Sequence, residues 1–136
     1  MKAISLWQPW ASAIPLGLKQ IETRGWYTHY RGPLAIHAAK RWTPEQREFA
    51  FLEHISGRLL PTSLPLGALV ATANMVECWR TDQMQVGEIE RRYGNYAPGR
   101  FAWVLRDVVA LPKPISWKGA QGFFNVPDEL FVKEAA

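Results

Sequence analysis

Three charged side chains, spaced closely near the N-terminus, have types that could do chemistry. Lys19, Glu22 and Arg24 follow Gly17 in the pattern G-x-K-x-x-E-x-R. If residues 20–24 form a strand, alternation places Glu22 and Arg24 on one face. Cations nearby favour an ionised carboxylate, which could accept hydrogen bonds from a base amine or take a proton from a 2′-hydroxyl. The lysine and arginine could bind phosphate, and the alternative is a purely structural Glu22–Arg24 ion pair.

Basic and aromatic side chains surround this motif. Residues 17–41 hold five basic side chains against one acidic side chain, whereas the remaining residues hold eleven of each. Clustered cations attract phosphates, and aromatic rings offer stacking surfaces for bases. The alternative is a solvated basic face with its aromatic residues in the core. Besides the motif and Trp7, the predicted nucleic-acid contacts are Gln8, Trp10, Trp26, Tyr27, Arg31, His37, Lys40, Trp117 and Lys118.

The elements that would position these residues follow from hydrophobic periodicity and breaker residues. A strand is predicted over 3–6, a helix opening at Pro9, extended chain over 20–24 and a strand over 34–39. Thr43, Pro44 and Gln46 predict a capping box and a helix to about residue 55, with Phe49, Leu52 and Phe51 facing inward. A loop is predicted over residues 58–65.

The second half of the chain contains the longest apolar runs. Strands are predicted over 67–79 and 101–111, with a weak helix over 86–93 and a turn over 95–100 between them. Pro112 and Pro114 are expected to end the second strand. A glycine-rich loop over 116–122 precedes a closing strand over 123–126 and a last helical turn over 128–134. The expected class is α+β: a mixed β-barrel of five to six strands with a few short flanking helices.

Length and composition narrow the class of protein. The 136 residues fit one domain, 1–136, with 48% hydrophobic and 21% charged residues. No apolar run approaches the roughly 18 residues of a membrane helix, and the N-terminus lacks a secretory pattern, so a cytoplasmic protein without a membrane partner is expected. Cys78 is the single cysteine and the three histidines lack ligand-like spacing. Neither a metal site nor a cofactor is predicted.

Four stretches of this sequence resemble one known family. LWQPWAS, the G-x-K-x-x-E-x-R motif, WYTHYRGPLAIHAAK and GRFAWVL together make the chain similar to the ASCH domain (activating signal cointegrator-1 homology), in the PUA-like superfamily. The resemblance covers essentially the whole chain. It implies a PUA-like barrel with a cleft where Lys19, Glu22 and Arg24 meet, and it implies RNA or nucleotide-related ligands.

The resemblance also implies which activities to weigh. Some ASCH proteins bind RNA, some bacterial members are ribonucleases, and others are acetylcytidine amidohydrolases. The amidohydrolases carry threonine where this chain has Glu22, and they use a downstream glutamate, for which Glu77, Glu88 and Glu90 are the candidates here. We therefore predict binding of RNA or single-stranded nucleic acid.

Whether the chain is an enzyme stays open. The alternative function is a metal-independent hydrolase with Lys19 and Glu22 as catalytic residues. As a ribonuclease it would use Glu22 or His37 as base, with Lys19 or Lys40 stabilising the phosphorane. As an amidohydrolase it would act on an acylated pyrimidine nucleoside. A third option is a partner-docking domain with a vestigial cleft.

Overall fold

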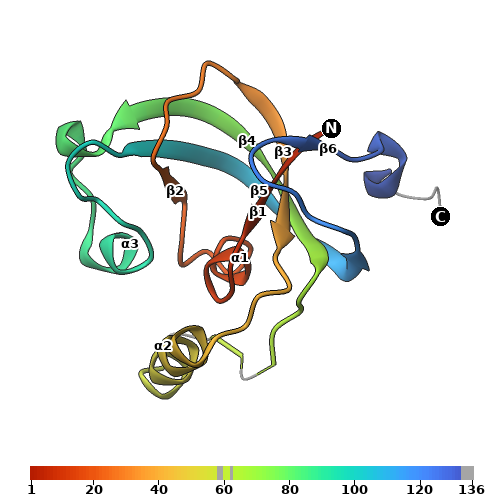
Figure 1. Cartoon of the computed structure of the whole chain (residues 1–136), viewed down its shortest axis with the longest axis horizontal. Coiled ribbons are helices and arrows are strands. Elements are labelled where there is room, and N and C mark those ends of the chain that lie inside the picture. The colour runs from red at the N-terminus through yellow and green to blue at the C-terminus, as the bar shows by residue number, and fades with distance from the viewer. Residues whose placement is uncertain (58–59, 62, 133–136) are drawn as a thin grey trace.

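One six-stranded mixed sheet forms the centre of the computed structural model, which describes residues 1–57, 60–61 and 63–132 (Figure 1). The strand order is β2-β5-β4-β3-β1-β6. β1 runs parallel to β3, and the other neighbours are antiparallel. The strands are β1 (Lys2–Leu6), β2 (Ile21–Arg24), β3 (Gly32–Ala38), β4 (Ala68–Arg80), β5 (Phe101–Ser116) and β6 (Phe124–Asn125).

The predicted mixed class with few short helices is confirmed, but the predicted barrel is not. Within the described residues the sheet ends at β2 on one side and β6 on the other, and these two strands do not pair. β2 pairs over four residues with β5, and β6 over two with β1. The hydrogen-bonded sheet therefore stays open.

The two longest strands contribute many of the buried hydrophobic residues of the core. β4 and β5 pair antiparallel and bury Trp103 completely. β5 runs on to Ser116, so the expectation that Pro112 would end it is wrong. The register jumps from Ala71 opposite Ala110 to Leu69 opposite Ile115, which places both prolines of the strand in the irregular stretch. Proline is tolerated there because no ladder hydrogen bond is required of it.

Short helices and 3-10 turns cover the ends of the strands, and α2 lies at one end of the molecule (Figure 1). None of the helices in the described part of the chain is long and apolar enough to cross a membrane. Two stretches with predicted structure, the 58–65 loop and the 128–134 turn, include residues 58, 59, 62 and 133–134, which lie outside the described part. The helical elements are α1 (Trp10–Ala13), α2 (Pro44–Ile55), α3 (Glu88–Arg92) and 3-10 turns at Thr81–Gln83 and Asp128–Phe131.

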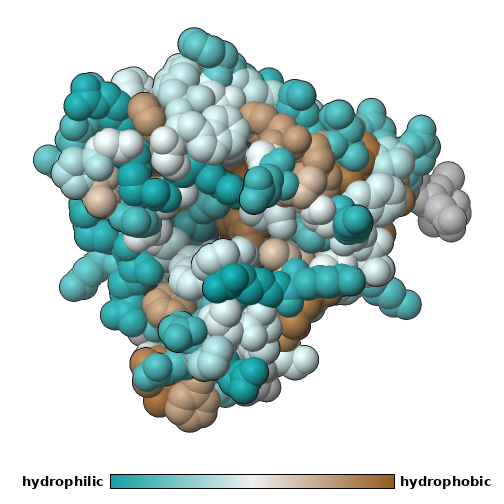
Figure 2. Space-filling model, viewed as in Figure 1, coloured by the Kyte–Doolittle hydropathy of each residue, from teal (hydrophilic) through white to brown (hydrophobic). Residues whose placement is uncertain are grey.

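The predicted capping box of α2 is confirmed. The Thr43 side chain accepts a hydrogen bond from the Gln46 amide, and the Gln46 side chain accepts one from the Thr43 amide. The predicted inward face is wrong for Phe51 and Leu52, which are 58% and 47% exposed. Figure 2 shows hydrophobic residues on the surface where α2 lies. Both of these side chains belong to the exposed hydrophobic residues of that helix.

Polar contacts turn a different face of α2 inward. Gln46 donates to the Gln8 carbonyl, and Glu53 pairs with Arg92. Both of these α2 side chains are buried, together with Ala50. Phe49 is partly buried, and its ring stacks on Trp10. The helix therefore docks through hydrogen bonds and an ion pair as well as through apolar packing.

Candidate functional site

The three charged residues of the motif meet in the structure. Lys19 Nζ lies 3.3 Å from Glu22 Oε1, and Arg24 Nε lies 3.1 Å from Glu22 Oε2. Lys19 is only 1% exposed and also donates to the Tyr93 carbonyl at 2.5 Å. Lys19 therefore lies behind Glu22, while Glu22 and Arg24, 12% and 22% exposed, reach toward solvent.

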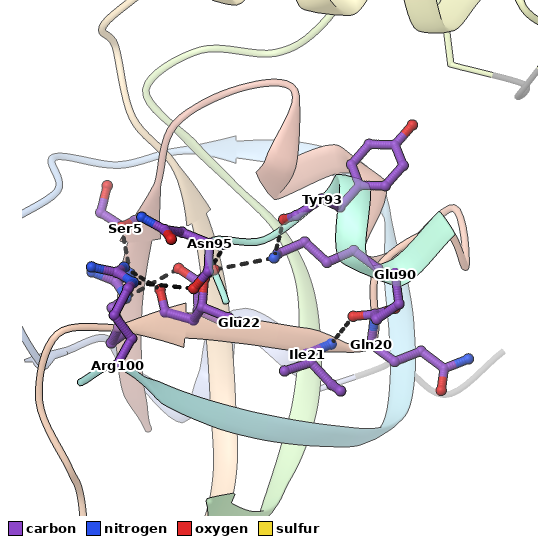
Figure 3. Close-up of polar contacts among 11 residues, drawn as sticks. Ser5, Gln20, Ile21, Glu22, Glu90, Tyr93, Asn95 and Arg100 are labelled. Atoms are coloured by element: carbon purple, nitrogen blue, oxygen red, sulfur yellow. Dashed lines mark hydrogen bonds and ion pairs between the residues drawn. The ribbon is translucent and has the colours of Figure 1, made fainter. Parts of the chain in front are cut away.

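Alternation along β2 gives this arrangement, as predicted. Ile21 and Thr23 point into the protein, and Glu22 and Arg24 point away from them. The start of the strand is held by the Glu90 carboxylate, which accepts hydrogen bonds from the backbone amides of Gln20 and Ile21. Figure 3 shows this clamp beside Glu22. The carboxylate of α3 thus sets the position of the motif strand.

Glu22 and Arg24 open into a cavity of about 540 Å³, which we term the motif cavity. Asn95 and Arg100 lie on its wall, near Glu22 in Figure 3. Arg100 is held by the carbonyls of Asn95 and Thr23. The side chains that line the motif cavity and bear on its chemistry are Trp7, Trp10, Glu22, Arg24, Asn95 and Arg100.

A second cavity of about 940 Å³ adjoins the first, and we term it the loop cavity. Both cavities are lined by Ser5, Trp7 and Arg24, so they adjoin at these residues. Figure 2 shows hydrophilic residues around a hollow near the middle of this face. The glycine-rich loop over 116–122 forms one wall of the loop cavity. Its other functional side chains are His37, Lys40, Trp117 and Lys118, and no described residue that lines it is acidic.

His37 is fully occupied as a positioning residue. Its Nε2 lies 2.7 Å from the Trp117 carbonyl and its Nδ1 lies 2.9 Å from Ser5 Oγ. Because a carbonyl only accepts, Nε2 carries the proton, and in the neutral ring Nδ1 accepts from the Ser5 hydroxyl. The loop comes so close that a Cβ at Gly119 would lie 2.6 Å from His37 Cε1. Neither ring nitrogen is free to act on a 2′-hydroxyl, which argues against the expected role of His37 as base.

The remaining predicted contacts lie outside both cavities. Gln8 is completely buried and bonds to the Ser12 amide and the Pro65 carbonyl. Trp26, Tyr27 and Arg31 belong to the connection between β2 and β3 and line neither cavity. The structure therefore brings together eight of the thirteen predicted residues around the cavities, with Lys19 behind them: Trp7, Trp10, Glu22, Arg24, His37, Lys40, Trp117 and Lys118.

Several residues of the site were not predicted from the sequence. Ser5 and Asn95 line the cavities without belonging to a motif. Arg100 lies in the GRFAWVL stretch but was not assigned a role, and that stretch is the signal that could have found it. None of the three acids proposed as a downstream catalytic group lines either cavity: Glu77, Glu88 and Glu90. Within the described residues, no three histidine, cysteine, aspartate or glutamate side chains are grouped so as to hold a metal ion.

Tyr96 lies beside the site with a buried hydroxyl. Its Oη makes no hydrogen bond within the described part of the chain. Burial raises the pKa of Tyr96 well above its usual range, and the negative charges of Glu90 and Glu22 raise it further, against the opposing charge of Arg91. The neutral phenol is thus the form that this environment favours.

Comparisons with known proteins identify the family of this chain. A sequence model of the ASCH domain matches residues 4–115. The chain is 35% identical over 89 residues to activating signal cointegrator 1 from Mus musculus and 34% identical to that from Homo sapiens. These alignments cover 60% of this chain but only 15% of either relative.

Solved structures share the fold. The crystal structure of ASCH from Zymomonas mobilis matches with a TM-score of 0.56 and 16% identity, covering 94% of this chain and 88% of that one. A mutant of the same protein matches with a TM-score of 0.56 and 18% identity, covering 94% and 89%. At such low sequence identity, the similarity to these structures shows a shared fold and nothing more.

Proposed function

The chain belongs to the ASCH domain family, and on that premise we propose that it binds RNA or another single-stranded nucleic acid across the two cavities. The family is PUA-like and is associated with RNA binding. The observation that carries the proposal is the charge of the loop cavity, where Arg24, Lys40 and Lys118 face solvent without any acid among the described lining residues. Such a surface attracts a phosphate backbone.

The motif cavity supports recognition of a base. Both oxygens of Glu22 are ion-paired, so this carboxylate offers only acceptors. An acceptor at the bottom of a cavity suits the exocyclic amine of cytosine or adenine. Trp7 and Trp10 on the same cavity offer aromatic surface for an unstacked base. A single-stranded ligand fits this arrangement because its bases are free to leave the stack.

A hydrolytic reaction in the motif cavity is the second candidate. Lys19 and Glu22 are in contact at 3.3 Å, and Glu22 lines a cavity of nucleoside size. Glu22 could take a proton from a 2′-hydroxyl or from a water attacking an acylated base. In this alternative His37 contributes by positioning the loop.

The test of binding uses a short labelled RNA with chelator present, titrated at several salt concentrations. We expect affinity to fall as salt rises. The double variant Lys40→Ala, Lys118→Ala should flatten the slope of log K against log salt by about one for each phosphate that is no longer neutralised. Lys113→Ala is the matched control, because Lys113 is exposed on β5 and lines neither cavity.

The same samples distinguish the second candidate. RNA length is read after incubation of the wild type and of Glu22→Gln. Shortened RNA with the wild type but not with Glu22→Gln would make the protein an enzyme, whereas intact RNA with a salt-dependent shift supports a binding module. Equal weakening by Lys113→Ala and by the double variant would contradict the assignment of the loop cavity.

A further inference from the structure

The two cavities adjoin one another and differ in size. They measure about 540 and 940 Å³, and both fall in the usual range of about 300–1,000 Å³ for sites that hold a small molecule. Ser5, Trp7 and Arg24 are the residues that line both. A single nucleoside in the motif cavity would therefore leave the loop cavity empty, and the shared residues would lie at the border.

The chemistry of the two cavities also differs. The motif cavity presents the Glu22 carboxylate and the Asn95 amide, which suit the hydrogen-bonding edge of a base. The loop cavity presents Lys40 and Lys118, and neither lysine makes an ion pair or hydrogen bond with another described residue. Cations that are free of partners suit phosphate. A ligand that satisfies both cavities carries a base at one end and negative charge toward the other.

Arg24 lies at the border with donor capacity left over. Its Nε pairs with Glu22 and its Nη2 donates to the Ser5 carbonyl at 2.9 Å. Its Nη1 makes no hydrogen bond within residues 1–57, 60–61 and 63–132. A guanidinium held on one side and open on the other is a fixed phosphate ligand.

Trp7 offers a ring at the same border. It is 50% exposed, and the Arg41 guanidinium lies 4.5 Å from its ring centroid. That contact restrains the ring and leaves it accessible from both cavities. An aromatic platform between two base-sized spaces is the arrangement that single-stranded ligands use for stacking.

We propose that the unit recognised by this site is a dinucleotide, with one nucleoside in the motif cavity, the adjoining nucleotide in the loop cavity and their phosphodiester at Arg24. The inference rests on the proposed function and specifies the ligand of that same site. On this proposal a single nucleoside fills only one of the two cavities. A third nucleotide would lie outside both cavities and would make none of the contacts described above.

The experiment measures affinity against ligand length at constant salt. Cytidine and adenosine, the 3′-phosphorylated dinucleotides CpCp and ApAp, and the 3′-phosphorylated trinucleotides CpCpCp and ApApAp are titrated into isotopically labelled protein. The terminal phosphate of the dinucleotides supplies a negative charge for Lys40 and Lys118 in the loop cavity. Amide chemical shifts report both affinity and location. We expect the step from one to two nucleosides to gain about tenfold or more, and the step from two to three to gain less than about threefold.

Two variants assign the gain to the two cavities. Lys118→Ala should remove much of the gain at the second nucleoside and leave nucleoside binding unchanged. Glu22→Gln should lower the affinity for every ligand in the series. Lys113→Ala, with the same change of charge outside the cavities, should behave like the wild type at each length.

The outcomes separate this inference from the function on which it rests. Nucleosides that bind as tightly as dinucleotides would overturn it, and so would affinity that climbs evenly with each added nucleotide. Either result would leave RNA binding standing if a longer RNA still binds. If the longer RNA also fails to bind, the proposed function itself is wrong.

Discussion

Among single residues, Lys19 has the clearest structural task, because it is a buried cation that holds Glu22 in place. Its ammonium contacts the Glu22 carboxylate and the Tyr93 carbonyl from a position that is 1% exposed. Because Glu22 lies between Lys19 and the motif cavity, a ligand in that cavity contacts Glu22 and not the lysine. Its contribution to recognition is to fix the carboxylate that a ligand meets.

Replacing Lys19 by methionine tests that task. Lys19→Met removes one of the two cations paired with Glu22 and the hydrogen bond to the Tyr93 carbonyl, while the pair of Glu22 with Arg24 remains. The variant should therefore lower the free energy of unfolding by about 1–3 kcal/mol. Urea denaturation followed by circular dichroism measures the change. Lys113→Met, at an exposed position, should stay within about 0.5 kcal/mol of the wild type. Equal stability of the two variants would contradict the buried pair.

Tyr96 gives a prediction with a defined pH dependence. A raised pKa means that the folded state binds the phenol proton more tightly than the unfolded chain, in which tyrosine titrates near about 10. The stabilising effect of that proton is complete below about pH 10 and declines as pH rises above it. Tyr96→Phe should remove this decline. It should also raise stability at neutral pH by about 1 kcal/mol, because a buried hydroxyl without a partner disappears.

Tyr30→Phe is the matched control for this change. The Tyr30 hydroxyl donates to the Pro33 carbonyl, so its removal should lower stability at neutral pH. Urea denaturation of both variants at pH 7, and of Tyr96→Phe and the wild type at rising pH, measures the effects. A Tyr96→Phe variant that is less stable than the wild type at pH 7 would show that the Tyr96 hydroxyl is hydrogen-bonded after all.

Among the elements, the glycine-rich loop depends most on close approach. His37 on β3 bonds to the Trp117 carbonyl, and Gly119 packs against the same ring. A side chain at position 119 would collide with His37 Cε1 at 2.6 Å and with Nδ1 at 2.8 Å. The loop must then move, and with it the wall that carries Lys118.

Gly119→Ala is therefore expected to weaken RNA binding and to lower stability by about 1–3 kcal/mol through overpacking. Thermal unfolding and the titration of labelled RNA measure the two effects. Gly87→Ala is the control, because a Cβ at Gly87 meets no atom within 4 Å and its φ of −65° is ordinary. An unaltered RNA affinity in Gly119→Ala would show that the loop wall is not part of the binding surface.

The elements also show what local sequence determines. The start of α2 was predictable because Thr43, Pro44 and Gln46 act on neighbouring backbone groups. Its inward face was not, because the partners that select it come from distant segments: Gln8 meets Gln46, and Arg92 meets Glu53. Polar docking leaves no periodic apolar signal, so hydrophobic periodicity was wrong for Phe51 and Leu52, although Phe49 does pack inward against Trp10.

For the molecule as a whole, strands were easier to predict than closure. Apolar runs mark each long strand, but whether a sheet closes depends on the pairing of its edges, and β2 and β6 carry no pattern that decides it. The candidate site, too, was predictable in one part and not in another. Motif spacing brought Glu22 and Arg24 together, whereas the cavity walls at Asn95 and Arg100 depend on how a polar turn folds back over β2.

The short reach of β6 has one more consequence. β6 pairs with Lys2 and Ala3, and farther along β1 the Ser5 carbonyl accepts a hydrogen bond from Arg24 instead. The guanidinium thus occupies the place of a missing strand while it also faces the cavities. During divergence, a substitution at this position would have to satisfy the backbone as well as a ligand. Arginine here would persist in a descendant that binds nothing, so its presence alone is no guide to activity.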